Sequence, residues 1–360
     1  MLKRDDALII GRGIPAGINC LAPNIALDNA AFIAALVAQG VPNPNLPPNP
    51  PFEIHPYKPL FPLQNFEKYI IGTFPPISYV LDRLLIINPG ITSLNQPGGA
   101  HYTNAPIIPF YHGNNNSMWP YLLTPPEWAG LVAVGLKNNK RTFLINKLID
   151  IGINYGDIID STQRRLTNGN YNASDNNLYN ICINNDLICH ILTNPNAKYL
   201  LFNTASVFTA GGLINVAGLV NVNLNTKSFD LFIRGCQEMG YKVELRIAAG
   251  IPATIFPWTN INALLPNQRM NKIAFEIRIT NPDGNSKGVC NSFKTGQSKI
   301  LTVIVGPFPA PFVAGVALAH NAQCIAWIHL NPDAINNDFI INIYKGFRNG
   351  NWPDLYGMNQ

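Results

Sequence analysis

Short apolar runs that alternate with helix-like stretches constrain the fold of this chain more than any other feature. Four runs rich in Ile, Leu, Val and aromatic residues have the length of buried strands: Tyr69–Ile71, Tyr199–Phe202, Lys242–Ile247 and Ile300–Val305. Two stretches between the first and second runs have helical periodicity: Arg141–Ile151 and Leu178–Leu192. This alternation favours an α/β fold in which helices cover a central, mostly parallel sheet of four strands.

Prolines and changes of pattern divide the chain into three parts. Residues 1–50 contain a helix-like stretch and then a Pro/Asn run, so we expect a helix and an extended strap there. Residues 51–325 hold the four apolar runs and form the α/β domain, with an insertion at about 211–297. The insertion contains Lys272–Ile279, which alternates like a half-buried strand. Residues 326–360 are expected to form a C-terminal extension.

The charge balance permits a polyanionic partner but does not demand one. The formal net charge is +5, and only 12% of the residues are charged, while 47% are hydrophobic. A chain with so many apolar residues and so little charge excess is not disordered. The Lys/Arg stripe typical of nucleic-acid-binding proteins is missing, so composition alone does not identify the partner.

The cysteines and the apolar pattern predict a cytoplasmic protein. Six cysteines lie far apart, without the spacing of a zinc site: Cys20, Cys182, Cys189, Cys236, Cys290 and Cys324. We interpret them as reduced thiols of the core. The sequence has no apolar run of 18 residues and no signal-peptide pattern, so we expect neither a membrane span nor secretion.

Two loop segments carry groups suited to chemistry. Gly72-Thr73-Phe74-Pro75-Pro76 follows the first apolar run, and its consecutive prolines prevent a continuing helix or strand ladder. A rigid structural turn is the simplest interpretation of this loop taken alone. The second segment, Phe110–Trp119, joins aromatic rings to a glycine turn and short amides. Aromatic rings beside hydrogen-bond donors suit a pocket that stacks a planar base.

An ordered set of motifs resembles the uracil-DNA glycosylase superfamily, in particular its mismatch-specific and hypoxanthine-type branches. The motifs are Ile71-Gly72-Thr73-Phe74-Pro75-Pro76, Phe110-Tyr111-His112-Gly113 with Asn116-x-Met118-Trp119, and Gly152-Ile153, Asp157-Ile158, Arg165 and Ala173–Leu178. The resemblance spans roughly His55 to Phe208 and returns near Ile300 to Pro311.

This resemblance implies a three-layer α/β/α sandwich that binds duplex DNA and flips one nucleotide into a pocket, where water attacks C1′. It implies no metal and no organic cofactor, and no obligate protein partner is evident. The chemistry is physically reasonable, because a base cannot be reached inside the stack and its glycosidic bond breaks through an oxocarbenium-like sugar. Amides and backbone N–H groups would stabilise the negative charge that grows on the base.

The resemblance also assigns roles to residues. The candidate catalytic residues are Asn116, Asp175, Asp157 and His112. The candidate base-pocket residues are Gly72, Thr73, Phe74, Pro75, Tyr111 and Asn203. The candidate DNA-binding residues are Pro76, Ser174, Arg165, Thr204, Ser206, Pro307, Phe308 and Pro309. Several of these residues have structural alternatives. Asp175 is placed to cap a helix and Asp157 to bond a loop. Phe308 suits a buried turn equally well, and Asn203–Ser206 suit a helix cap.

The chain departs from the superfamily pattern at two places. The first motif has no carboxylate to activate water, and the last motif, Gly306–Pro311, has no His or Asn. From the resemblance we expect a monofunctional glycosylase acting on a damaged or modified base, in repair or in defence against phage DNA with bases such as glucosylated hydroxymethylcytosine. The two departures motivate the alternative, a catalytically inert DNA-binding relative of the same fold.

Overall fold

The computed structural model describes a central sheet and helices that pack on it. The described residues are 53–55, 63–74, 93–95, 101–103, 118–134, 137–164, 166–167, 170–171, 178–202, 214–215, 218–219, 228–246, 274–282, 290, 293–305 and 336–350. The predicted helix and strap of residues 1–50 lie outside this part of the chain, as does most of the predicted insertion.

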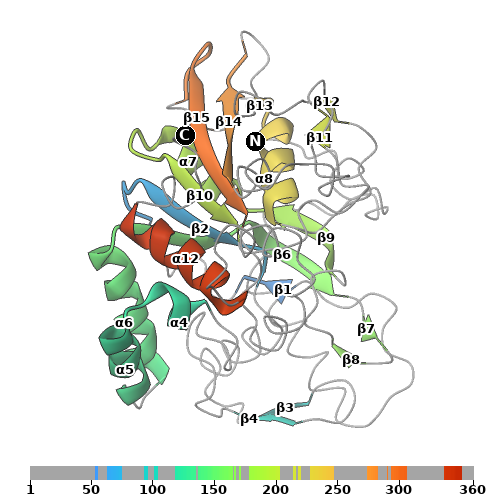
Figure 1. Ribbon diagram of the computed structural model, residues 1–360. Coiled ribbons are helices and arrows are strands. Elements are labelled where there is room, and N and C mark those ends of the chain that lie inside the picture. Colours follow the sequence, from blue (N-terminus) through green and yellow to red (C-terminus); the bar gives the residue numbers. More distant parts are fainter. Residues whose placement is uncertain are drawn as a thin grey trace.

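The central sheet has six strands, four of them parallel to one another (Figure 1). In spatial order they are β13 (Lys242–Arg246), β14 (Ala274–Thr280), β15 (Ser298–Val305), β10 (Tyr199–Phe202), β2 (Lys68–Gly72) and β5 (Ile153–Asp157). The parallel strands are β15, β10, β2 and β5, whereas β13 and β14 add an antiparallel edge. The sequence predicts a mostly parallel sheet correctly, but its count of four strands is too low.

The two additional strands show why the count was too low. All four apolar runs contribute strands to this sheet, and the run Lys242–Ile247 does so through its described residues Lys242–Arg246. The strand β14 comes from the predicted insertion and joins the central sheet through β15. The strand β5 contains Asn154, Gly156 and Asp157 and so lacks the apolar pattern of a buried strand. Asn154 is fully buried, and its burial is tolerated because its side chain bonds the backbone N–H and C=O of Gln64, both at 2.8 Å.

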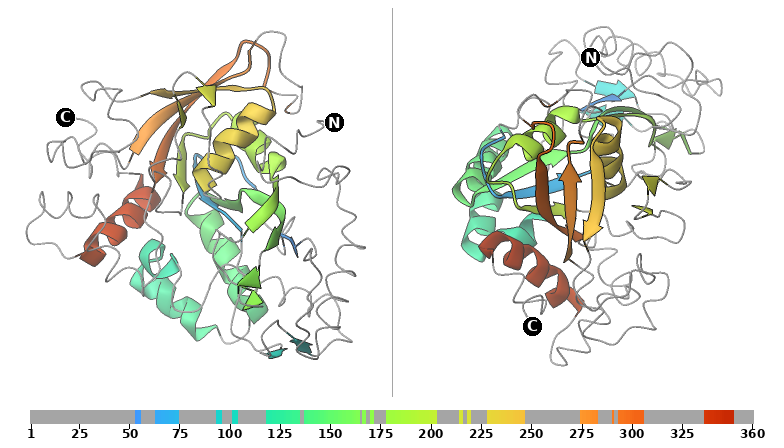
Figure 2. Two further views of the ribbon diagram at one scale, coloured as in Figure 1. Left: turned by 90° about the vertical axis from the view of Figure 1, so that its right-hand side faces the viewer. Right: turned by 90° about the horizontal axis from the view of Figure 1, so that it is seen from above.

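The sheet separates two apolar cores because neighbouring strand residues point to opposite faces. Tyr69 and Ile71 of β2 belong to one core, and Ile70 belongs to the other. The first core includes residues of β9 (Leu178–Ile183), α7 (Asn185–Thr193) and α8 (Ser228–Glu238). The second includes residues of α4 (Trp119–Leu122), α5 (Pro125–Ala133), α6 (Lys137–Asp150) and α12 (Asn336–Asn349). Figure 2 shows α8 and α12 on different sides of the sheet.

The predicted helix Leu178–Leu192 is wrong over its first half. The structure divides this stretch into the strand β9 and the helix α7, with Asn184 between them. Asn184 ends the strand and caps the helix, since its Oδ1 accepts from the backbone N–H of Leu187 at 3.2 Å. The other predicted helix, Arg141–Ile151, is confirmed as α6, which begins four residues earlier and ends at Asp150.

Smaller antiparallel sheets accompany the central one. The strands β1 (Glu53–Ile54), β6 (Ile159–Arg164) and β9 form a three-stranded sheet in that order. Three two-stranded pairs complete the described strands: β3 (Ser93–Asn95) with β4 (His101–Thr103), β7 (Leu166–Thr167) with β8 (Asn170–Tyr171), and β11 (Ile214–Asn215) with β12 (Gly218–Leu219).

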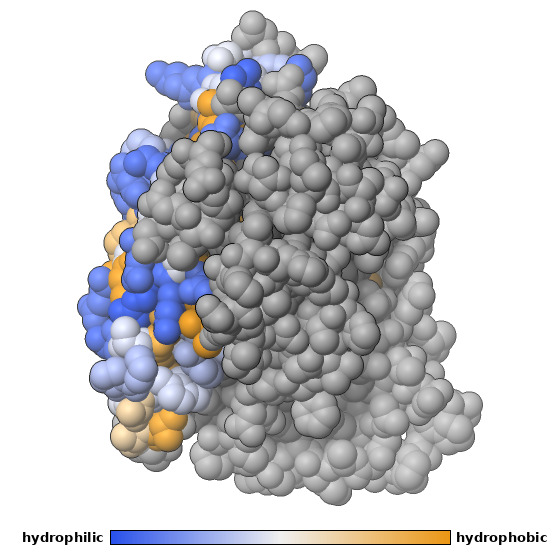
Figure 3. Space-filling view, in the orientation of Figure 1, coloured by the Kyte–Doolittle hydropathy of each residue, from blue (hydrophilic) through white to orange (hydrophobic). Residues whose placement is uncertain are grey.

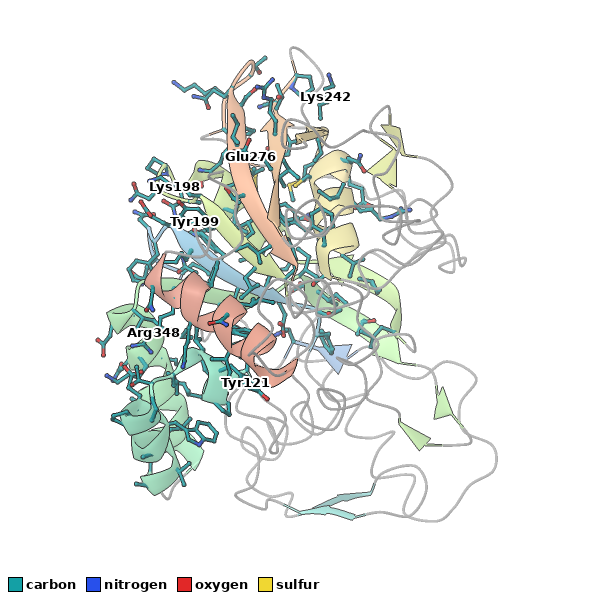
Figure 4. The ribbon with its side chains drawn as sticks, in the orientation of Figure 1. Tyr121, Lys198, Tyr199, Lys242, Glu276 and Arg348 are labelled. Atoms are coloured by element: carbon teal, nitrogen blue, oxygen red, sulfur yellow. A yellow bond between two sulfur atoms is a disulfide. The ribbon has the colours of Figure 1, made fainter. Side chains whose placement is uncertain are left out.

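The helix α12 packs on the second core through apolar side chains, and Arg348, labelled in Figure 4, adds polar contacts. The two terminal nitrogens of the Arg348 guanidinium group donate to the Glu127 carboxylate at 2.5 and 3.0 Å, and the Arg348 carbonyl accepts from Lys68 Nζ at 2.6 Å. The hydrogen bond from Arg348 is the largest cause that lowers the pKa of Glu127 to about 2. The segment predicted as a C-terminal extension thus contributes a helix that packs on the sheet.

The expectation of reduced cysteines is wrong for one pair. Cys189 of α7 and Cys290 form a disulfide across 101 residues of sequence, with their Cα atoms 5.2 Å apart. Cys182 and Cys236 are buried and form no disulfide, and burial raises the pKa of the Cys236 thiol. Cys20 and Cys324 lie outside the described residues. Wide spacing along the sequence did not prevent the pairing, because folding brings α7 and the segment before β15 together.

No helix within the described ranges is long and apolar enough to cross a membrane.

Candidate functional site

The order of the parallel strands points to one edge of the sheet. Along the chain they follow as β2, β5, β10 and β15, but in space β2 lies between β5 and β10. After β2 the chain therefore adds the next strand on one side of β2 and the following two on the other side, so the strand order reverses beside β2. In open α/β sheets, ligands bind beyond the carboxyl ends of the strands at such a switch point. The residues that follow β2 are Thr73 and Phe74 of the first motif.

At this edge the ends of β2 and β5 are paired by backbone hydrogen bonds. Gly72 and Asp157 are partners in the strand register. The pairing continues past the strands, because the Ile158 N–H donates to the Gly72 carbonyl at 3.0 Å and the Ile159 N–H donates to the Thr73 carbonyl at 3.1 Å. The first motif and the Asp157 motif, separated by more than 80 residues of sequence, are thereby held in a fixed relation.

The Asp157 carboxylate fills the space beside Gly72. Asp157 is 4% exposed, and a Cβ added at Gly72 would overlap Asp157 Oδ1 and lie 3.1 Å from the Tyr155 hydroxyl. Only glycine leaves room at position 72 for this carboxylate. The glycine that the sequence identifies as a pocket residue therefore has a specific physical reason, which is the close approach of a charged group.

His55 completes the arrangement and was missed by the sequence reasoning. Its Nε2 lies 2.9 Å from Asp157 Oδ2, and its side chain is 6% exposed. The strand β1 pairs with β6, and the His55 N–H donates to the Asp160 carbonyl at 2.9 Å, which places the ring beside Asp157. The ring also meets the edge of Phe74, with ring centres 5.6 Å apart at 88°. No local pattern marks His55, because its role depends on the pairing of two distant strands.

Thr73 is one of several buried residues of the described structure with an unsatisfied polar atom. Thr73 is 6% exposed, and within the described structure its Oγ1 is buried without a hydrogen-bond partner. A buried hydroxyl without a partner costs about 1–3 kcal/mol. Such a cost is common where a site is built to hydrogen-bond a ligand. We refer to His55, Gly72, Thr73 and Asp157 as the carboxyl-edge cluster.

The structure brings together four of the predicted site residues, Gly72, Thr73, Phe74 and Asp157. The other predicted catalytic and base-pocket residues lie outside the described residues: Asn116, Asp175, His112, Pro75, Tyr111 and Asn203. The predicted DNA-binding residues also lie outside them: Pro76, Ser174, Arg165, Thr204, Ser206, Pro307, Phe308 and Pro309. These assignments therefore stay predictions.

A second polar group lies at the amino ends of the same strands, where Figure 4 labels Lys198 and Tyr199. It consists of Tyr69, His190, Asn194 and Lys299, which we call the amino-edge network. Asn194 Nδ2 donates to the Tyr69 hydroxyl at 2.7 Å, and that hydroxyl lies 2.9 Å from His190 Nδ1. Lys299 Nζ donates to the Asn194 carbonyl.

Burial governs the protonation of this network. Desolvation raises the pKa of Tyr69 to about 12 and lowers the pKa of Lys299 to about 8. Desolvation, followed by the charge of Lys299, also lowers the pKa of His190. In the tautomer with Nδ1 unprotonated, a neutral His190 accepts a hydrogen bond from the Tyr69 hydroxyl, which in turn accepts one from Asn194, so the hydrogen bonds form a continuous chain.

The described surface offers few other candidates for a binding site. On the face in Figure 3 the described residues are mainly hydrophilic with scattered apolar spots. The large apolar side chains exposed among them are Val132, Ile149 and Ile300, which lie on different elements. Nor do the described residues contain a group of three or more His, Cys, Asp or Glu side chains that could hold a metal ion.

Comparison with known proteins adds no relative: no protein-family model, curated protein or solved structure matches this chain.

Proposed function

We propose that this protein is a DNA glycosylase that flips a damaged or modified base out of duplex DNA and hydrolyses its N-glycosidic bond. One observation carries the proposal. The Asp157 carboxylate lies against Gly72 of the first motif, at the carboxyl edge of the parallel strands and beside the switch point. This is where the strand order favours a ligand.

The position of Asp157 compensates for the departure of the first motif from the superfamily pattern. The motif Gly72–Pro76 contains no carboxylate of its own. The neighbouring strand β5 supplies one at its last residue, in register with Gly72. A carboxylate at this place can accept a proton from water as the water attacks C1′, and its charge stabilises the oxocarbenium-like sugar.

Thr73 supports the same proposal, because its hydroxyl is suited to binding the flipped base. A flipped base is recognised through hydrogen bonds to its polar edge. The buried Thr73 hydroxyl, which has no partner within the described structure, is a group that such an edge would satisfy. Its neighbour Phe74 is 6% exposed and packs on the His55 ring, so it stiffens the wall that bears Thr73.

The proposal also includes further features of the fold, the partner, the location and the chemistry. They are a three-layer α/β/α sandwich, DNA as the partner, a cytoplasmic location, and hydrolysis without metal or organic cofactor. Asn116, Asp175 and His112 would join Asp157 around the flipped nucleotide, and Phe308 between its prolines would enter the gap left in the duplex. A role in repair and a role in defence against modified phage DNA both fit this chemistry.

The test is the release of free bases from DNA, measured by mass spectrometry. The substrates are duplexes containing uracil, hypoxanthine or glucosylated hydroxymethylcytosine, together with phage and cellular DNA. We expect the wild type to release one class of base and leave abasic sites. We expect Asp157→Asn to slow release by roughly 10²–10⁴-fold, the usual contribution of a general acid or base. The matched control is Asp150→Asn, which changes an exposed carboxylate at the end of α6.

The outcomes separate the two hypotheses drawn from the sequence. Base release that depends on Asp157 but not on Asp150 supports the glycosylase. Tight binding to modified duplexes without release of any base would favour the catalytically inert DNA-binding relative. Release by Asp157→Asn at the rate of the wild type would refute the role of Asp157 and leave the activity intact.

A further inference from the structure

The partner of Asp157 is the feature that the motifs leave unexplained. His55 lies outside all the motifs, yet its ring nitrogen lies 2.9 Å from Asp157 Oδ2. The two side chains are 6% and 3% exposed, so both have lost nearly all their water. A buried ionised carboxylate needs hydrogen bonds to offset its loss of hydration. The N–H of His55 supplies one of them.

Stabilisation of the fold is by itself a weak explanation for the buried pair of His55 and Asp157. Burying two ionisable groups costs desolvation energy that their attraction often fails to recover, and apolar side chains of similar volume commonly stabilise a core as well or better. The pair also lies at the edge of the sheet where the strand order places a ligand. Buried titratable groups with a specific partner at such a place are candidates for functional groups.

The geometry fixes both oxygens of the carboxylate. His55 bonds Oδ2, while Oδ1 lies on the side of Gly72. The His55 ring is fixed in turn by the edge of Phe74 and by the pairing of β1 with β6. Three separate segments of the chain therefore determine the direction in which Oδ1 points.

We propose that His55 is a positioning residue for Asp157: it holds Oδ2 so that Oδ1 faces the first motif and accepts a proton from the attacking water. This inference rests on the proposed glycosylase function. In the step, one O–H bond of water breaks as its oxygen forms a bond to C1′, and the proton passes to Oδ1. The N-glycosidic bond breaks at the same carbon, and the base leaves with the electron pair. Asp157 then returns the proton to solvent, from which the base anion takes one.

Two variants at position 55 distinguish the hydrogen bond to Asp157 from the space that the ring fills. His55→Phe keeps an aromatic ring of similar size against Phe74 but has no N–H to donate. His55→Gln keeps a donor group but cannot carry the charge of an imidazolium. Both are measured on whichever of the uracil, hypoxanthine and glucosylated hydroxymethylcytosine duplexes the wild type cleaves, with kcat and KM determined separately and melting temperatures recorded.

We expect His55→Phe to lower kcat by roughly 100-fold with KM nearly unchanged, because it removes the orientation of a general base. His55→Gln restores most of the rate, since its amide can donate to Oδ2. The double variant His55→Phe/Asp157→Asn is no slower than Asp157→Asn alone, because both changes act through one carboxylate.

The outcomes that contradict the proposal differ from those that contradict the function. If the wild type releases base and His55→Phe is equally fast, the glycosylase stands and the positioning role of His55 is wrong. Equal loss in both His55 variants, with a raised KM and a lowered melting temperature, marks a structural residue and also overturns the proposal. A wild type that releases no base from any of these DNAs overturns the glycosylase and the role of His55 together.

Discussion

Two polar groups, each with a histidine, lie at opposite edges of the same parallel strands, and they differ in how completely they are satisfied. In the amino-edge network, Tyr69, His190, Asn194 and Lys299 bond one another and the nearby backbone. In the carboxyl-edge cluster, a carboxylate is pressed against a glycine, and the hydroxyl of Thr73 makes no hydrogen bond within the described structure.

This contrast separates a structural group from a candidate site. A closed network of hydrogen bonds makes a buried polar region stable and leaves nothing for a ligand to satisfy. An unsatisfied hydroxyl beside a buried carboxylate lowers stability, and such a cost is commonly found at functional sites. We therefore expect changes at the amino edge to affect folding alone and changes at the carboxyl edge to affect chemistry as well.

The largest expected effect is on stability and concerns the disulfide beside the amino-edge network. Cys189 precedes His190 on α7, and its bond to Cys290 closes a long segment of the chain. Replacing both cysteines by alanine should lower the free energy of unfolding by about 4 kcal/mol, because the unfolded chain gains freedom. Denaturant unfolding measures the loss. Base release per folded molecule should not change.

A reductant provides the control for the disulfide. It should destabilise the wild type by a similar amount and leave the Cys189→Ala/Cys290→Ala variant unaffected. If the free energy of unfolding is the same once the disulfide has been reduced, the disulfide contributes nothing to stability.

Gly72→Ala breaks the carboxyl-edge cluster directly. The added methyl group overlaps Asp157 Oδ1, so the carboxylate must move away from its place beside Gly72. We expect a loss of about 2–3 kcal/mol in unfolding free energy, as for other overpacked sites, together with loss of base release in the folded fraction. Chemical denaturation and single-turnover base release are the two measurements.

The matched control for Gly72 is Gly130→Ala on α5. A Cβ at Gly130 meets the Phe143 ring at 3.5 Å, an ordinary contact, so alanine fits there. Since alanine favours a helix over glycine, this variant should be slightly more stable than the wild type, by about 0.5–1 kcal/mol. A Gly72→Ala protein as stable and active as Gly130→Ala would show that Asp157 does not need the space beside Gly72.

Asn194→Ala tests whether the amino edge is purely structural. Asn194 is 3% exposed, and its side chain bonds the Phe66 carbonyl and the Tyr69 hydroxyl, both at 2.7 Å. Its removal leaves these buried groups without one partner each and should cost about 1–2 kcal/mol. Thermal unfolding and base release are measured together. A loss of base release greater than the loss of folded protein would contradict the division between the two edges.

The smallest expected effect is a dependence of stability on pH that comes from Lys299. Its pKa is lowered from 10.5 to about 8 by burial, so between these values the unfolded chain binds more protons than the folded one. The contribution of Lys299 to stability should therefore rise with pH from about 8 upward, while the raised pKa of the Cys236 thiol acts in the opposite direction in the wild type and in any Lys299 variant alike. The gain is under about 1 kcal/mol, because the half-exposed amine is screened by solvent.

The window for this measurement ends near pH 10. The raised pKa of Tyr69 acts in the opposite direction above that point, since the unfolded tyrosine loses its proton first. Denaturant unfolding between pH 8 and 10 should give a smaller slope for Lys299→Met than for the wild type. Equal slopes would show that Lys299 titrates as it does in the unfolded chain.

Local pattern was enough to predict much of the fold. The side-chain pattern alone predicts the strands β2, β10, β13 and β15 and the helix α6. The strand β5 was missed because its buried face includes Asn154, whose burial depends on a contact with Gln64 of a distant segment. The pattern that begins at Leu178 predicts one helix, because short apolar runs fit both a strand and a helix.

The candidate site was predicted in pieces. The motif resemblance singled out Gly72, Thr73, Phe74 and Asp157, and the structure places these four together. It could not single out His55, which is 102 residues from Asp157 and lies in no motif. It also assigned all cysteines to the reduced state, because sequence spacing does not report which thiols meet in space.

By itself, the sequence determined that this chain forms an α/β sheet and that a glycine-bearing loop follows one of its central strands. Hydrophobic periodicity and turn chemistry act over a few residues, so they can be identified without the fold. The tertiary structure alone decided that Asp157 lies against Gly72, that His55 bonds Asp157, and that Cys189 joins Cys290. Each of these contacts joins segments far apart in the chain, and their closeness follows from the order of strands in the sheets and from the packing of helices upon them.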